Sequence, residues 1–152
     1  MITHSTANLW HLRLARWLVL AALTCAVASV PALAQDMAKP PAGAFVKITS
    51  PANGATVKSP VKVAMAVHGM EINPAGPLKE GTGHHHLVID TIPPAAGVAV
   101  PADAQNLHFG KGQTEAELTL SPGIHTITAA FADGVHRVYG PQMTDTIIIK
   151  VE

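Results

Sequence analysis

Short apolar stretches separated by turn residues run along the chain from residue 45 to residue 151. The clearest is Val61–His68, where Val61, Val63, Met65 and Val67 alternate with polar or small residues. A period of two places alternate side chains on opposite faces of an extended strand. No stripe with the 3.6-residue period of a helix appears in this part of the sequence. The pattern therefore predicts an all-β domain.

Eight segments share this character, and glycine, proline, asparagine, aspartate or serine separates most of them. They are Phe45–Thr49, Val61–His68, His84–Thr91, Leu107–Phe109, Glu115–Leu120, Ile124–Ala132, Val135–Tyr139 and Thr144–Val151. The dipeptides Asn53-Gly54 and Asp133-Gly134 are typical of tight turns. Seven or eight short strands at this spacing predict an immunoglobulin-like β-sandwich.

The first 34 residues follow a different pattern. Arg13 and Arg16 precede an apolar run of 12 residues, and Ala32-Leu33-Ala34 ends the segment with small residues. A membrane-spanning helix needs ~20 apolar residues, whereas this arrangement is typical of a secretory signal peptide. Cys25 leaves a lipoprotein anchor as an alternative, although Ala22-Leu23-Thr24 before it matches a lipobox poorly.

We therefore expect a signal peptide at 1–34 with cleavage after Ala34, a flexible leader at 35–44 and a β-sandwich at 45–152, in a periplasmic or secreted protein. The mature chain would contain no cysteine, which excludes disulfides, thiolate nucleophiles and Cys-ligated zinc. Without Arg13 and Arg16 its formal net charge is −2, with no basic patch for nucleic acid. It has no membrane span, and the sequence identifies no protein partner.

Histidine is enriched in the mature chain, whose 118 residues keep seven of the nine histidines. On an extended strand His84 and His86 share one face, and His85 points to the other. His-x-His spacing places the two Cα atoms roughly 6–7 Å apart, so that both imidazoles can reach one metal ion. This pair is the most specific chemical feature of the sequence.

A metal ion needs further ligands, and several histidines lie near predicted strand ends, where the loops of a sandwich gather. Imidazole suits copper, zinc, nickel or iron, and a thioether from Met70 or Met143 would favour Cu(I). Asp90 could be a ligand or the acceptor that orients an imidazole. The sequence predicts a copper or zinc site drawn from His84, His86, His108, His125 and His136.

Structural roles are the alternative for the same residues. His125 would then be a corner residue bonded to a main-chain carbonyl, His136 a solvated hairpin residue, and His108 a support for the glycine-rich loop. The protein would then be a non-catalytic accessory or interaction module of the cell envelope. A small metalloenzyme is a third alternative, although the sequence has neither a G-x-S-x-G nucleophile motif nor paired carboxylates.

Four stretches of the sequence resemble a family of short exported bacterial proteins known only as a domain of unknown function. They are Val67-His68-Gly69-Met70, Gly83-His84-His85-His86-Leu87-Val88-Ile89-Asp90, His108-Phe109-Gly110-Lys111-Gly112-Gln113-Thr114-Glu115 and Leu120-Ser121-Pro122-Gly123-Ile124-His125-Thr126. The resemblance covers residues 45–151 and implies the fold and the exported location, but no activity. Some members are labelled rod-shape-determining proteins, a label that does not suit a mature chain without membrane spans.

Overall fold

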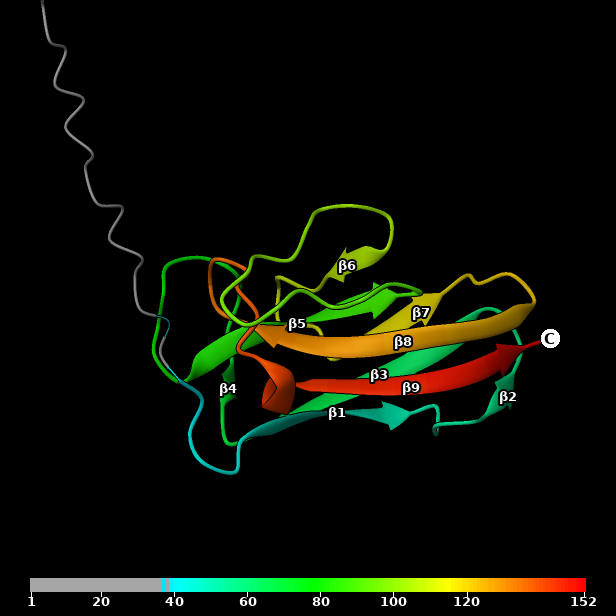
Figure 1. The fold of residues 1–152 in the computed structure, drawn as a ribbon, viewed down its shortest axis with the longest axis horizontal. Coiled ribbons are helices and arrows are strands. Elements are labelled where there is room, and N and C mark those ends of the chain that lie inside the picture. Colours follow the sequence, from blue (N-terminus) through cyan, green and yellow to red (C-terminus); the bar gives the residue numbers. More distant parts are fainter. Residues whose placement is uncertain (1–36, 38) are drawn as a thin grey trace, which may run out of the picture. The chain divides into compact units, whose positions relative to one another are not determined.

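The computed structural model describes residue 37 and residues 39–152, so the expected signal peptide and residues 35, 36 and 38 of the leader lie outside the described residues. Nine strands and one short 3₁₀ turn form this part of the chain (Figure 1). They are β1 (Phe45–Ser50), β2 (Thr56–Val57), β3 (Val61–His68), β4 (Glu71–Ile72), β5 (Thr82–Ile89), β6 (Asn106–His108), β7 (Glu115–Leu118), β8 (Gly123–Ala132), η1 (Pro141–Met143) and β9 (Thr144–Val151).

Two sheets make up the fold. One has the order β1-β3-β7, and the other has the order β2-β9-β8-β5-β4, with β6 paired to β5 (Figure 1). The pairs β1–β3, β3–β7, β5–β6, β5–β8 and β8–β9 are all antiparallel. This distribution, with β1, β3 and β7 in one layer and β5, β8 and β9 in the other, is that of an immunoglobulin-like sandwich. The predicted all-β class and two-sheet architecture are confirmed.

Apolar side chains from both sheets form one core between the layers. The alternation predicted for β3 places Val61, Val63 and Met65 in this core. From the other sheet, β8 contributes Ile127 and Phe131, both fully buried. Alternate residues of each strand therefore face the opposite sheet, as expected for aligned sheet packing.

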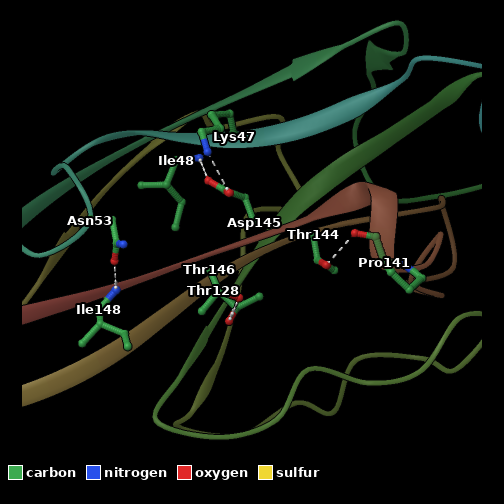
Figure 2. A network of polar contacts seen from close by, with 9 residues as sticks. All are labelled: Lys47, Ile48, Asn53, Thr128, Pro141, Thr144, Asp145, Thr146 and Ile148. Atoms are coloured by element: carbon green, nitrogen blue, oxygen red, sulfur yellow. Dashed lines mark hydrogen bonds and ion pairs between the residues drawn. The ribbon is translucent and has the colours of Figure 1, made fainter.

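Polar side chains connect β1 and the turn after it to β9 (Figure 2). Asp145 accepts hydrogen bonds from Lys47 Nζ at 3.0 Å and from the main-chain N–H of Ile48 at 2.8 Å. Asn53 Oδ1 accepts another from the main-chain N–H of Ile148 at 2.8 Å. Because β1 and β9 belong to different sheets, Asp145 links the two layers directly.

The observed strands differ from the prediction by one or two residues at several ends, and in three larger respects. The short strands β2 and β4 were not predicted, since two-residue segments leave no alternation to detect. The third predicted strand begins two residues earlier, at Thr82. Residues 135–139, predicted as a strand, form instead a loop with two isolated bridges, Ala99↔Arg137 and Ala132↔Val138. Within the described part of the chain no helix is long and apolar enough to cross a membrane.

Candidate metal centre

The strand β5 positions the first two histidines of the cluster. It lies inside its sheet, between β8 on one side and β4 and β6 on the other, and all eight of its residues are buried. Leu87 and Ile89 face the core between the sheets, so the alternate residues His84 and His86 face outward. The pairs His84↔Ala132 and His86↔Ala130 place a small residue beside each imidazole on β8.

The third histidine, His108, ends the short strand β6. The antiparallel register pairs it directly with His86, so that their rings stack with centroids 5.0 Å apart. Gly110 lies against the same ring, because a Cβ added there would be only 2.2 Å from His108 Cε1. A glycine at 110 is therefore required for His108 to keep its place in the cluster.

The fourth histidine, His136, lies in the loop after β8 and has a positive φ of 71°. Its loop is held by Asp133, a carboxylate only 3% exposed. Asp133 Oδ1 accepts hydrogen bonds from the main-chain N–H groups of Val135 and Arg137, and Oδ2 accepts one from Arg137 Nε. The main chain of His136 also donates to Asp133 and accepts from Val100. These contacts fix a backbone conformation that is uncommon for a residue other than glycine.

Four imidazoles converge on one point. The candidate ligand atoms of His84, His86, His108 and His136 all lie within 4.8 Å of one another. His84 Nε2 lies 3.0 Å from His86 Nε2 and 3.1 Å from His136 Nδ1. The structure thus brings together the predicted strand pair and two histidines from segments distant in sequence.

The cluster is buried on one side and open on the other. His84 and His86 are 0% and 2% exposed, whereas His136 is partly exposed and His108 is exposed. Burial, together with the neighbouring imidazoles, lowers the pKa of His84 to about 4 and that of His86 to about 3. Burial also lowers the pKa of His108, with a smaller contribution from His136. At neutral pH these three rings are therefore neutral and each keeps a nitrogen lone pair.

A loop from the β4–β5 connection ties together the two segments that carry the outer histidines. Ala75 donates a main-chain hydrogen bond to Gly110 at 2.9 Å, and Gly76 donates one to Gly134 at 2.9 Å. Gly134 also lacks room for a side chain, since a Cβ there would lie 2.5 Å from the Gly76 carbonyl oxygen. The loop therefore contacts both of the segments that carry His108 and His136.

His125, the fifth expected ligand, lies outside the cluster. Its Nδ1 donates to Asp90 Oδ2 at 2.7 Å and its Nε2 donates to the Ser121 carbonyl at 2.8 Å. Two structural reasons separate it from the other four histidines. It shares the inward face of β8 with Ile127, and it is seven residues, or ~23 Å along the strand, from Ala132 beside His84. The corner role considered for His125 matches these contacts.

The remaining candidates are also outside the cluster. Asp90 orients the imidazole of His125 and not that of a clustered histidine. The reason is that β5 ends at Ile89, so Asp90 does not continue the face that carries His84 and His86. His85 faces the core and contacts Phe131 edge-on. The exposed His68 stacks on Phe45. Of the two methionines considered as ligands, Met143 is buried in the hydrophobic core and Met70 packs against it.

Asp133 and Gly110 are the supporting residues that sequence reasoning missed. Asp133 was noted only in a turn-forming Asp-Gly dipeptide, and Gly110 only within the stretch that begins at His108. An aspartate three residues before a histidine could have suggested a side chain that holds the turn. The steric role of Gly110 requires knowing which side chain lies beside it, and the sequence alone does not give that.

A comparison with protein families matches residues 63–152 to a domain of unknown function, DUF4399. The chain belongs to this family. The matched part of this DUF4399 protein begins within β3 and includes all four clustered histidines, together with Gly110 and Asp133. No curated protein and no solved structure matches the chain.

Proposed function

We propose that this protein binds a divalent transition-metal ion, copper or zinc, in the periplasm through His84, His86, His108 and His136. The observation that carries the proposal is the convergence of four imidazole nitrogens within 4.8 Å. Zinc and copper both accept imidazole nitrogen, and no carboxylate or thiolate belongs to this group of ligand atoms. The periplasmic location rests on the signal peptide expected at 1–34.

The distances suit a metal centre after small adjustments. Metal–nitrogen bonds of ~2.0–2.1 Å in a tetrahedral site place neighbouring nitrogens ~3.3 Å apart. His84 Nε2 lies slightly closer than this to His86 Nε2 and to His136 Nδ1, at 3.0 and 3.1 Å. Binding therefore requires shifts of a few tenths of an ångström for these pairs and a contraction of the longest separations.

Hydrogen bonding alone satisfies the cluster poorly. A neutral imidazole nitrogen carries either one hydrogen or one lone pair in the ring plane. His84 Nε2 faces both His86 Nε2 and His136 Nδ1, so it makes one well-directed hydrogen bond at most. A cation between the four rings would engage all of the converging lone pairs together.

The test is metal titration of the full chain, purified without a histidine tag and first stripped with a chelator. We expect one Cu(II) or Zn(II) ion per chain by calorimetry. Free metal at about 100 times Kd adds about 2.7 kcal/mol to the free energy of unfolding. For a domain of this size that raises Tm by roughly 10 °C.

Two variants make the test specific. His84→Ala/His86→Ala should abolish the metal-dependent rise in Tm, whereas His68→Ala removes a histidine outside the cluster and should preserve it. A double variant that keeps the rise would exclude His84 and His86 as ligands. If no metal alters the wild-type protein, the cluster is structural, and the accessory-module interpretation is favoured.

A further inference from the structure

The four histidines of the cluster differ in burial and in the contacts that hold them in place. His84 and His86 lie on an interior strand and are almost completely buried. His136 is fixed by the loop that Asp133 holds. His108 is exposed, ends a three-residue strand, and has no hydrogen bond to its ring among the interactions of the described residues.

From this asymmetry we infer that the metal is exchangeable cargo, and that it enters and leaves through the coordination position of His108. The inference rests on the proposed function and adds the route of exchange. His84, His86 and His136 form a fixed three-nitrogen base. His108 is the ligand that an incoming donor replaces.

The position of the cluster supports cargo over a structural metal. The main hydrophobic core lies between the two sheets and contains Leu87 and Ile89 of β5, so the alternate residues His84 and His86 of the same strand point away from it. Because His84 and His86 face away from this core, the two sheets can pack whether or not a metal is bound. Structural zinc sites, in contrast, contribute directly to the folding free energy.

The exchange step is a ligand substitution without redox chemistry. An external nitrogen or sulfur donor forms a bond to the metal as the bond from His108 breaks, and the freed imidazole keeps its lone pair. Repeating the substitution at the three remaining histidines transfers the ion to a small chelator or to another protein. His108 is substituted first because its ring is the exposed one.

Rescue by free imidazole tests this route. In the full-length protein, His108→Ala opens a coordination position that solvent can reach, while His86→Ala opens one inside the protein. With Cu(II) as the probe, we expect His108→Ala to transfer copper to EDTA about tenfold faster than wild type, or more. Millimolar imidazole should restore slow transfer and the wild-type copper spectrum in His108→Ala, and it should restore neither in His86→Ala.

Several results decide the matter. Equal rescue of His86→Ala and His108→Ala would overturn the inference, as would wild-type transfer rates in His108→Ala. Unfolding of the wild-type protein on chelation would also overturn it, because the metal would then be structural. If His86→Ala does not fold, His84→Ala replaces it as the variant that should resist rescue, because His84 is also fully buried. Failure of wild type to bind Cu(II) at all would instead refute the proposed function.

Discussion

The Gly110→Ala variant tests the geometry of the site without replacing any of the four histidines. A Cβ at position 110 would lie 2.2 Å from His108 Cε1 and 2.3 Å from His108 Nε2, where ordinary contacts are 3.4–4 Å. The imidazole must therefore move by more than about 1 Å, which exceeds the tolerance of a preorganised site. We expect Gly110→Ala to displace His108 from the cluster.

The effect on the fold should be small. Gly110 is not among the glycines with positive φ, so alanine fits its backbone conformation. Replacing glycine at such a position stabilises by about 0.4–1 kcal/mol, and moving a side chain off its rotamer costs about 0.5–1.5 kcal/mol. These contributions nearly cancel, so Tm without metal should remain within about 4 °C of wild type.

The effect on metal binding should be large by comparison. At a metal concentration of about 100 times the wild-type Kd, the wild-type protein gains about 2.7 kcal/mol. If affinity falls roughly tenfold with the loss of His108, the gain at the same concentration falls to about 1.4 kcal/mol. Thermal unfolding with and without Cu(II) or Zn(II) measures both quantities in one experiment.

Gly83→Ala is the matched control, because its added Cβ meets main chain and not a movable ring. That Cβ would lie 2.2 Å from the Ala132 carbonyl oxygen and 2.7 Å from Phe131 Cε1. We expect it to destabilise the protein by about 1–3 kcal/mol or more, with or without metal. Wild-type metal affinity in Gly110→Ala, or a loss of stability as large as that of Gly83→Ala, would refute the reasoning.

Three further substitutions test other parts of the structure. Asp133→Asn weakens the hydrogen bonds that hold the loop of His136. Metal affinity in titrations should fall roughly tenfold, and the free energy of unfolding measured in urea should fall by about 1.5–3 kcal/mol. Unchanged metal affinity would contradict the role of Asp133 in positioning His136. The hydrogen bond to Asp90, followed by that to Ser121, raises the pKa of His125. The charged His125–Asp90 pair therefore contributes its full stability below the ordinary histidine pKa of about 6.5, and this contribution is lost as pH rises through the folded-state pKa of His125. The stability difference between wild type and Asp90→Asn, measured in chelator, should therefore shrink as the pH rises above about 6.5, and a constant difference would exclude the charged pair. His85→Leu replaces a ring whose two nitrogens are buried without partners, and should raise the free energy of unfolding by up to about 1–3 kcal/mol with metal binding intact; a stability loss would show that the ring has an essential contact.

Alternation along the chain was enough to predict most strands and that His84 and His86 share one face of their strand. It could not supply the pairing between strands that places His108, nor the side-chain contacts that shape the loop of His136. His108 reaches the site because β6 adds to β5 in the register His86↔His108, after a loop that carries no periodic pattern. His136 reaches it because an aspartate side chain, and not a regular strand, determines the local backbone. The first is a tertiary effect, and the second is a local turn held by a side chain.

The error with His125 has a different physical origin, because part of the information was available in the sequence. His125 lies on the same face of its strand as Ile127 and Phe131, because the three are separated by even numbers of residues. Both of these apolar residues face the core of the sandwich. Parity alone could therefore have placed it on the face opposite to an outward cluster. Proximity to a strand end is a weak criterion, because each strand has two ends and they lie at opposite ends of the sandwich.

The run of three histidines places chemically identical side chains in two environments with opposite consequences. Interior strands buried on both faces are normally rich in valine, isoleucine and leucine, and each buried imidazole costs desolvation free energy unless its nitrogens are engaged. On the outward face, His84 and His86 lie next to other imidazoles, so a single cation can engage one nitrogen of each ring. On the inward face, Phe131 is the only ring partner of His85 among the described residues, and a metal bound on the other side of the sheet does not reach His85. Stability and metal binding should therefore respond independently to substitutions at alternate positions of this one strand.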